Sequence, residues 1–154
     1  MVHYDISKDL STARVPGLCG RSTLISYEQM HSLAVEGALH ERFHIVFDHP
    51  VLASTIDFEG SPTVEDLLDA LYSHFDKRAG SREMSNLMED MYLFRNAVDT
   101  QVKRCEAAFD ARTEWDRGMK RVDILGKGRK FHGIYLDSDT SISDYLTLRV
   151  VFGE

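Results

Sequence analysis

The chain has 154 residues, of which 43% are hydrophobic and 28% are charged, and its formal net charge is −7. These are the values of a globular protein, and a chain of this length buries enough apolar surface to fold without a disulfide or a metal. The acidic balance argues against nonspecific binding to nucleic acid or to an anionic membrane, although it leaves room for local basic patches.

The two cysteines, Cys19 and Cys105, lie far apart in the sequence and in no CxxC pattern. Two unpaired thiols in a reducing compartment explain them better than a disulfide between them. The N-terminus shows no basic segment followed by an apolar run, and no stretch approaches about 18 consecutive apolar residues. We therefore expect a cytoplasmic protein without a membrane-spanning segment.

The first part of the chain, residues 1–35, is predicted to form an irregular arm on a single domain that spans residues 1–154, with its core in residues 42–152. Tyr4-Asp5-Ile6 suits a short edge strand. The segment from Ser11 to Thr23 is rich in turn residues, so it should wrap the surface. Between Ile25 and Leu39 the apolar spacing suits one or two helical turns.

Two strands and a helix follow. Residues 43–47 and 51–58 are rich in β-branched and aromatic side chains and are separated by Asp48-His-Pro50, which predicts a hairpin. Thr63 with Asp66 resembles a capping box at the start of a helix, which should end near Gly80.

A second, longer helix is predicted from Ser81 or Ser85 to Thr113. Its apolar residues recur at helical spacing, namely Leu87, Met88, Met91, Val98, Val102, Cys105 and Phe109. Because about thirty residues exceed the usual helix length, it should either kink near Asn96 or consist of two helices in tandem.

The last part of the chain is predicted to be β-structure. Arg121–Leu136 alternates apolar and other residues on both sides of a Gly126-Lys-Gly128 turn, which is typical of a hairpin. Asp123 is a carboxylate among apolar neighbours, so it needs a partner, for which Arg112 and Arg121 are the candidates. Residues 144–152 alternate in the same way and predict a third strand.

Together these elements predict an α+β fold in the order β-β-α-α-β-β-β. It should contain one mixed or mostly antiparallel sheet, with two main helices, one of them long, packed on one face.

Several segments resemble a known family in order and spacing. They are Thr63-Val-Glu-Asp-Leu-Leu, Ala107-Ala-Phe-Asp-Ala-Arg112, Gly118-Met-Lys-Arg-Val-Asp-Ile-Leu125 and Phe131-His-Gly-Ile134. The chain thus resembles the DUF6699 family, small fungal proteins of unknown function that are common in mushroom-forming fungi. The resemblance places Arg112, Arg121, Asp123, Phe131 and Gly133 at signature positions, and it assigns them no catalytic role.

The signature charges are the candidate ligand-binding residues. Arg112, Arg121 and Asp123, with His132 nearby in sequence, could line a pocket in which guanidinium groups bind a carboxylate or a phosphate. The competing interpretation is a buried structural ion pair between helix and sheet. Similarly, Lys127, Arg129 and Lys130 suit either an anionic partner or a solvated turn, and they lack the spacing of a phosphate loop.

The sequence gives weaker indications of metal binding by histidines and of catalysis by cysteines. His40 and His44 would share a helical face, as metal ligands do, but a strand over residues 43–47 would separate them, and His49 adds no known motif. Cys105 lies on an apolar stripe, and Cys19 in a loop is the only candidate for an exposed nucleophile. We predict no metal and no cofactor.

Two functions stay open. Met84, Met88 and Met91 with Tyr92 and Phe94 suggest either core or an adaptable docking surface, so the first hypothesis is a non-enzymatic interaction or scaffold module that forms a homodimer or meets a protein partner. The alternative is a small-molecule-binding protein or enzyme, with an anionic ligand in a pocket between sheet and helices near Arg112, Arg121 and Asp123.

Overall fold

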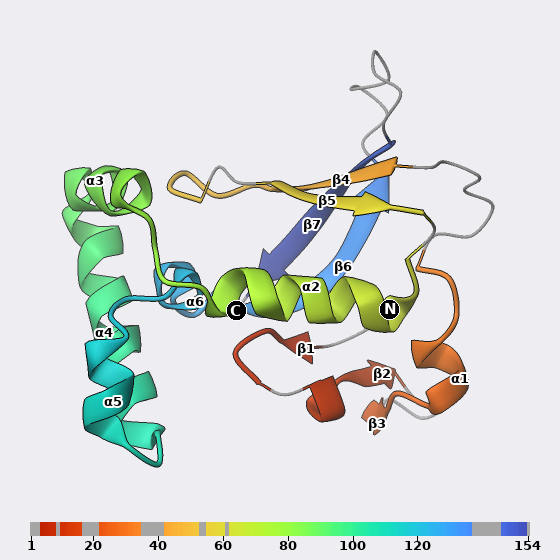
Figure 1. Ribbon diagram of the computed structural model, residues 1–154, viewed down its shortest axis with the longest axis horizontal. Helices are drawn as coiled ribbons and strands as arrows, with labels where there is room; N and C mark the ends of the chain where they lie inside the picture. Colours follow the sequence, from red (N-terminus) through yellow and green to blue (C-terminus); the bar gives the residue numbers. More distant parts are fainter. Residues whose placement is uncertain are drawn as a thin grey trace.

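A five-stranded mixed sheet curls around one helix, and the helices of residues 81–125 stand at one end of it (Figure 1). The computed structural model describes residues 4–8, 10–16, 22–34, 42–52, 55–60, 62–136 and 146–153. Its elements, in chain order, are β1 (Tyr4–Asp5), the 3₁₀ helix η1 (Leu10–Thr12), β2 (Arg14–Pro16), β3 (Ser22–Leu24), α1 (Tyr27–Met30), β4 (Arg42–Phe47), β5 (Thr55–Glu59), α2 (Val64–Asp76), α3 (Ser81–Glu89), α4 (Met91–Ala107), α5 (Ala111–Asp116), α6 (Arg121–Leu125), β6 (Lys130–Leu136) and β7 (Leu146–Gly153). The predicted α+β class is confirmed.

The strand order in the sheet is β1-β6-β7-β4-β5. All neighbours are antiparallel except β4 and β7, which run parallel with Ile45 opposite Leu148. Alternate residues of β4 are buried, so its period of two directs Phe43, Ile45 and Phe47 to one face. The predicted hairpin of β4 and β5 and the predicted strand near the C-terminus are confirmed, but β5 begins at Thr55, and Val51 and Leu52, predicted as strand, lie outside it.

The segment predicted as an arm contributes regular structure and part of the core. Tyr4 of β1 pairs with Phe131 at one edge of the sheet, as expected for an edge strand. Strands β2 and β3 form a separate two-stranded sheet. Ser26 caps the short helix α1, and the remainder of the predicted helical turns, residues 35–39, lies outside the described residues.

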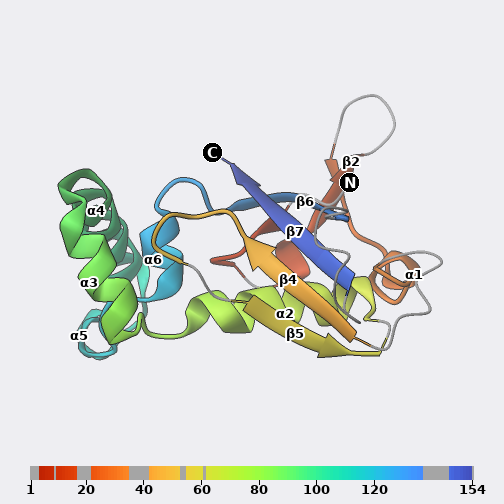
Figure 2. The ribbon, with the colours of Figure 1, turned by 90° about the horizontal axis from the view of Figure 1, so that it is seen from above.

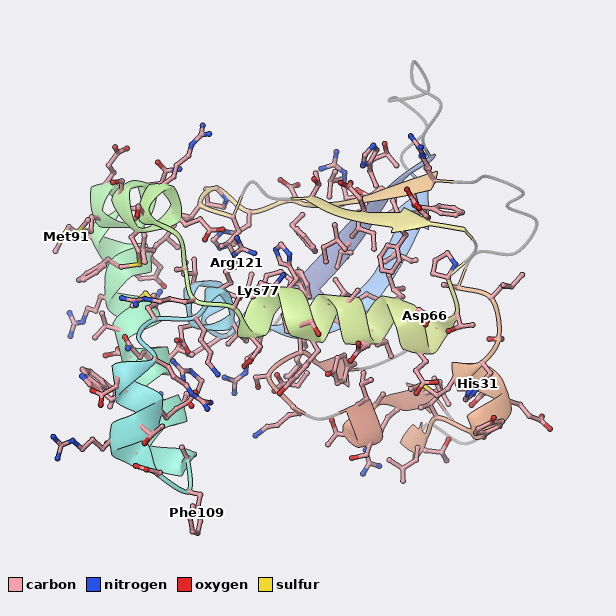
Figure 3. The ribbon with its side chains drawn as sticks, viewed as in Figure 1. His31, Asp66, Lys77, Met91, Phe109 and Arg121 are labelled. Carbon is pink, nitrogen blue, oxygen red and sulfur yellow. The ribbon has the colours of Figure 1, made fainter. Side chains whose placement is uncertain are left out.

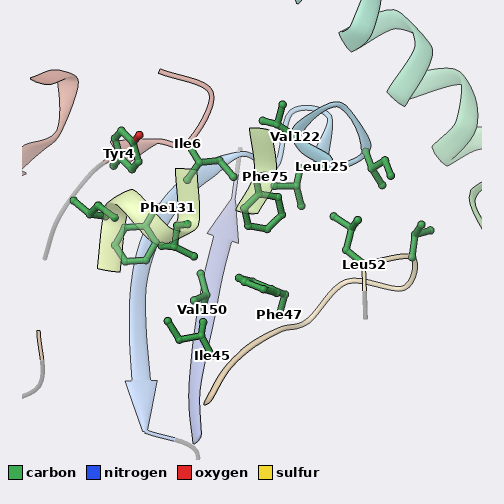
Figure 4. Close-up of a cluster of buried hydrophobic side chains, with 14 of the residues drawn as sticks. Tyr4, Ile6, Ile45, Phe47, Leu52, Phe75, Val122, Leu125, Phe131 and Val150 are labelled. Carbon is green, nitrogen blue, oxygen red and sulfur yellow. The ribbon is translucent and has the colours of Figure 1, made fainter. Parts of the chain in front are cut away.

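Helix α2 lies against the concave side of the sheet (Figures 1 and 2). The predicted capping box is confirmed, since Thr63 Oγ1 accepts the Asp66 amide at 3.1 Å and Asp66 Oδ2 accepts the Thr63 amide at 2.9 Å. The buried side of α2 carries Leu67, Leu68, Leu71, His74 and Phe75. These residues meet the sheet in a core that Figure 4 shows around Phe75, with Ile45, Phe47 and Val150 from β4 and β7.

The predicted long helix is three helices, α3, α4 and α5. The first break comes at Asp90 rather than at Asn96, so the predicted kink near Asn96 is wrong, and helices do follow in tandem, but there are three where two were predicted. Asp90 leaves the helical conformation, and its Oδ1 accepts the amides of Tyr92 and Leu93 at 2.9 and 3.0 Å. A carboxylate that caps the next helix ends the previous one, which explains the position of the break.

The predicted hairpin over Arg121–Leu136 is wrong in its first half. Residues 121–125 form helix α6, and only residues 130–136 form a strand. The helix begins because Asp123 Oδ2 accepts the Lys120 amide at 2.9 Å, and it ends at Gly126, whose φ of +59° suits glycine. Val122, Ile124 and Leu125 are all buried, so this single turn has no polar face to reveal its helical period.

Candidate functional site

Asp123 lies at the centre of a buried ionic network. Its side chain is fully buried. Arg104, at the end of α4, donates from Nε to Asp123 Oδ1 at 2.9 Å and from Nη2 to Oδ2 at 2.7 Å. The partner of Asp123 is therefore Arg104 from α4. The prediction that Arg112 or Arg121 pairs with Asp123 is wrong. Two parallel hydrogen bonds from a planar guanidinium form the strongest kind of charge pair in proteins.

The network continues through Glu114 on α5. Glu114 accepts hydrogen bonds from Arg104 Nη1 and, at 2.8 Å, from Lys120 Nζ, and it also pairs with Arg117 at 3.0 Å. Lys120 in turn binds Asp76 at the end of α2, at 2.7 Å. Three cations therefore face three carboxylates, so the network ties α2, α4, α5 and α6 together without leaving a net charge.

The geometry fixes the protonation of these groups. Burial alone lowers the pKa of Lys120, but its hydrogen bonds to Asp76 and Glu114, together with the negative charges of these two groups, outweigh burial and raise that pKa above its ordinary value. Burial also lowers the pKa of Arg104, but its hydrogen bond to Asp123 and the negative charges of Asp123 and Glu114 together outweigh burial and raise that pKa. The hydrogen bond from Lys120 lowers the pKa of Glu114. Each of these three groups stays ionised at neutral pH, so none of the three exchanges protons readily there.

A cleft of about 330 Å³ opens above this network. Its walls come from the ends of α2 and α4, from α5 and α6, from the loop after β1 and from the segment before β6. The acidic side chains that line it are Asp76, Glu114 and Asp123, and the cationic ones are Lys8, Lys103, Arg104, Lys120 and Arg129. The acidic three are all engaged with buried cations, so Lys8, Lys103 and Arg129 add positive charge that the network does not balance.

The cations outside the network lie in accessible positions. Lys8 and Lys103 are exposed, and neither forms an ion pair within the part of the chain that the structure describes. Arg129 is half-buried and directs its Nε to Asp5 at 3.3 Å. The cleft therefore combines a rigid, neutral floor with a positive rim, in a protein whose net charge is −7.

The structure does not bring the four sequence-predicted site residues together. Arg112 is exposed on α5 and does not line the cleft. Arg121 turns toward α3, where its Nε binds Glu83 at 2.9 and 3.2 Å (Figure 3). His132 lines a separate hollow between α2 and β6, and only Asp123 reaches the cleft.

Arg121 also faces a buried histidine. Its Nη1 lies 3.3 Å from His74 Nε2, and the His74 ring stacks on Phe47 with 5.2 Å between ring centroids. Burial, followed by the charges of Arg121 and Lys77, lowers the pKa of His74 to about 4, and Glu83 opposes the shift. His74 is therefore neutral at pH 7, and this cluster packs α6 against α2 and α3.

The remaining histidine and cysteine candidates are dispersed. His44 on β4 pairs with Asp57 on β5, and His49 Nδ1 accepts the amides of Val51 and Leu52 at 3.2 and 3.3 Å. His40 and Cys19 lie outside the described residues, and Cys105 is a buried free thiol. Among the residues that the structure describes, no three His, Cys, Asp or Glu side chains form a group that could hold a metal ion.

A second notable surface is an apolar corner where α3 meets α4, formed by Met88, Met91 and Tyr92. Their side chains are 56%, 72% and 74% exposed, while Leu87 beside them is fully buried. Met91 points away from the body of the protein at the start of α4, and the exposed Phe109 lies just beyond the other end of that helix (Figure 3). The predicted stripe is therefore divided between core and surface.

Arg104 is the main site residue that sequence reasoning missed. It follows Ala97 by two turns and Gln101 by one turn of α4, and both of these residues are buried. Arg104 therefore lies on the buried face of α4, where a cation needs a buried carboxylate as its partner. Because Asp123 is likewise a charge among apolar residues, the sequence could have suggested that the two form a pair. Lys8 and Lys103 carried no comparable signal, since a lone exposed lysine is ordinary.

Comparisons with known proteins agree with this description at the level of the family. Residues 2–152 match the family described as "Family of unknown function (DUF6699)". The chain belongs to this family, which confirms the resemblance seen in the sequence. Searches of curated proteins and of solved structures find no match. In the described part of the chain, no helix has the length and apolarity needed to cross a bilayer.

Proposed function

We propose that the protein binds a small anionic ligand in the cleft above the Arg104–Asp123 network and does so without catalysing a reaction. The observation that carries the proposal is the uncompensated charge of Lys8 and Lys103 on the rim of the cleft, beside Arg129, whose Nε pairs with Asp5. Clefts of this size commonly hold small ligands and position them with a few polar groups. The site thus differs from the one expected around Arg112 and Arg121.

A binding role fits the cleft better than catalysis. The pKa shifts of Arg104, Glu114 and Lys120 all favour the ionised form, whereas a general acid or base needs a pKa near the working pH. The network therefore suits a rigid floor that holds the rim cations in place.

The test is a calorimetric titration with inorganic phosphate, citrate and succinate at low ionic strength. We expect at least one of these anions to bind, and Lys103→Glu to weaken its binding by at least tenfold. Arg95→Glu is the matched control, because Arg95 is exposed on the same helix, away from the cleft, and the charge change is identical. Equal losses in both variants, or no binding of any anion, would contradict the proposal.

A second candidate is the homodimeric interaction module expected from the sequence. The apolar corner of Met88, Met91 and Tyr92 supports it, since several large exposed apolar side chains close together in the chain are typical of docking surfaces. We expect light scattering after size exclusion to give a dimer mass at high protein concentration and a monomer mass for Met91→Glu. A monomer at all concentrations excludes this candidate.

Two finer expectations accompany the proposal as predictions. One is that the protein is fungal, as the family resemblance implies. The other is that it works in the cytoplasm, which the sequence suggests through its unpaired cysteines.

A further inference from the structure

A second hollow adjoins the cleft and shares two of its cations. It measures about 400 Å³ and is lined by Lys103 and Arg129 from the cleft, by Lys127 from the turn after α6 and by Lys130 at the start of β6. Because Lys103 and Arg129 line both spaces, a ligand seated between them reaches into each. The two hollows are therefore two parts of one surface, with the shared cations at its middle.

The shared surface is strongly positive. Lys8, Lys103, Lys127 and Lys130 are exposed, and no carboxylate pairs with any of them in the described residues. Asp5 is the carboxylate that lines the second hollow. Asp5 already accepts hydrogen bonds from the Ser7 amide at 3.0 Å and the Ser7 hydroxyl at 2.6 Å, and it binds Arg129 Nε. Its charge is thus shared between the loop after β1 and Arg129, and it leaves the four lysines unbalanced.

We propose that this double hollow binds a small polyphosphate, with one phosphate between Lys8, Lys103 and Arg129 and a second beside Lys127 and Lys130. The inference rests on the proposed function and specifies its ligand. A phosphate carries up to two charges at pH 7 and accepts hydrogen bonds on several oxygens, so it suits clustered lysines better than a carboxylate does.

The number of anionic groups follows from the weakness of each contact. An exposed lysine contributes little to the binding of a single charge, because water and salt screen it. Two linked phosphates bind more tightly, since once the first is held the second is kept at a high local concentration beside its own lysines. A single phosphate would fill only one of the two hollows.

A long nucleic acid suits the surface less well than a compact ligand does. The positive patch is local, and the protein as a whole carries a net charge of −7, which repels an extended polyanion beyond the patch. The turn from Gly126 to Lys130 also follows a helix and leads into a strand, so it is unlike a nucleotide phosphate loop, which leads into a helix. The lysine side chains themselves therefore supply the recognition.

The experiment compares inorganic phosphate, pyrophosphate and tripolyphosphate by calorimetry at fixed ionic strength, without divalent cations. We expect tripolyphosphate to bind at least tenfold more tightly than inorganic phosphate. The double variant Lys127→Ala/Lys130→Ala should weaken tripolyphosphate far more than inorganic phosphate, so that the two affinities differ by less than about threefold. Lys103→Glu should weaken both ligands, and Arg95→Glu should change neither by more than about threefold. All of these positions are exposed, and unchanged melting temperatures will show that the variants are folded.

The outcomes separate this inference from the proposal beneath it. Equal affinities for all three phosphates would overturn the polyphosphate assignment and leave a site for a single anion. Binding of none of the anions would overturn both the assignment and the proposed function. Tighter binding of a short single-stranded DNA than of tripolyphosphate, measured under the same conditions, would also overturn the assignment in favour of a nucleic-acid surface.

Discussion

Arg104 and Asp123 lie on different helices and meet through two hydrogen bonds, of 2.9 and 2.7 Å, in the interior of the protein. The remaining Nη2 proton of Arg104 reaches the Gly118 carbonyl at 3.0 Å. Gly118 has a φ of +78°, a backbone conformation that turns the chain after α5 and suits glycine. The pair therefore fixes α4, α6 and the connection between them with one guanidinium.

Asp123→Ala should destabilise the protein by about 3–5 kcal/mol, because it leaves Arg104 and part of the network without their partner. Urea denaturation followed by circular dichroism measures the free energy of unfolding. Asp99→Ala is the control, since Asp99 is an exposed carboxylate on α4; it should change stability by no more than about 0.5 kcal/mol. Similar values for the two variants would contradict the assignment.

Arg104→Lys should also destabilise, by about 2 kcal/mol, although it keeps the charge. A lysine cannot donate to Asp123, Glu114 and Gly118 in the planar arrangement that Arg104 uses, so buried acceptors lose their donors. The same denaturation experiment on Lys103→Arg, the neighbouring exposed position, provides the comparison. The prediction fails if both conservative exchanges are neutral.

His74 should make stability depend on pH in mildly acidic solution. Its pKa is about 4 in the folded protein and near 6.5 when exposed, so the unfolded state takes up the proton first as the pH falls. The contribution of His74 to the free energy of unfolding is fully present above pH 6.5. It declines toward pH 4 by about 1.4 kcal/mol per pH unit, or about 3 kcal/mol in all. His74→Gln should flatten that slope, whatever its stability at pH 7. Parallel curves for the two proteins would refute the prediction.

Asp90→Ala should cost about 1 kcal/mol, because it removes the cap that satisfies the first amides of α4. Asp90→Asn should restore most of this loss, since its amide oxygen can accept the same hydrogen bonds. Thermal denaturation of the two variants distinguishes capping from a general effect of charge. An equal loss in both would point to the charge instead.

Leu87→Ala and Met91→Ala should differ widely, although both residues lie on the predicted apolar stripe. Leu87 is fully buried, so its truncation should cost about 2–5 kcal/mol, whereas Met91 is 72% exposed and should change stability by less than about 0.5 kcal/mol. Chemical denaturation of dilute protein measures both as monomers. A large loss from Met91→Ala at low concentration would show that this corner is covered.

The sequence predicted those parts of the fold in which one local pattern dominates. A run of β-branched and aromatic residues identified β4, and the pairing of Thr63 with Asp66 identified the start of α2. The prediction failed for residues 121–125, because a single helical turn buried on all sides has the same composition as a buried strand. The position of the helix break was also available in principle, since Asp90 carries an ordinary capping signal inside a long apolar pattern.

The candidate site was less predictable, because it depends on distances across the chain. Asp123 was recognised as a charge that needs a partner, but Arg104 comes from a helix nineteen positions earlier. Asp123 pairs with Arg104 rather than with Arg112 or Arg121 because of how α4 packs against α6, and no local sequence pattern specifies that packing. Lys8 and Lys130 approach the same surface only because β1 pairs with β6 at the edge of the sheet.

The parallel pairing of β4 with β7 has a consequence for the order of folding. Strand β7 lies between β6 and β4, so it joins the β4–β5 hairpin to the β1–β6 pair. The helices α2 to α6 separate β4 from β7 in the sequence, and each can form its local contacts early. We therefore expect helix formation to precede closure of the sheet, with insertion of β7 as the slow step. During synthesis on the ribosome, both halves of the sheet would wait with an open edge until β7 emerges.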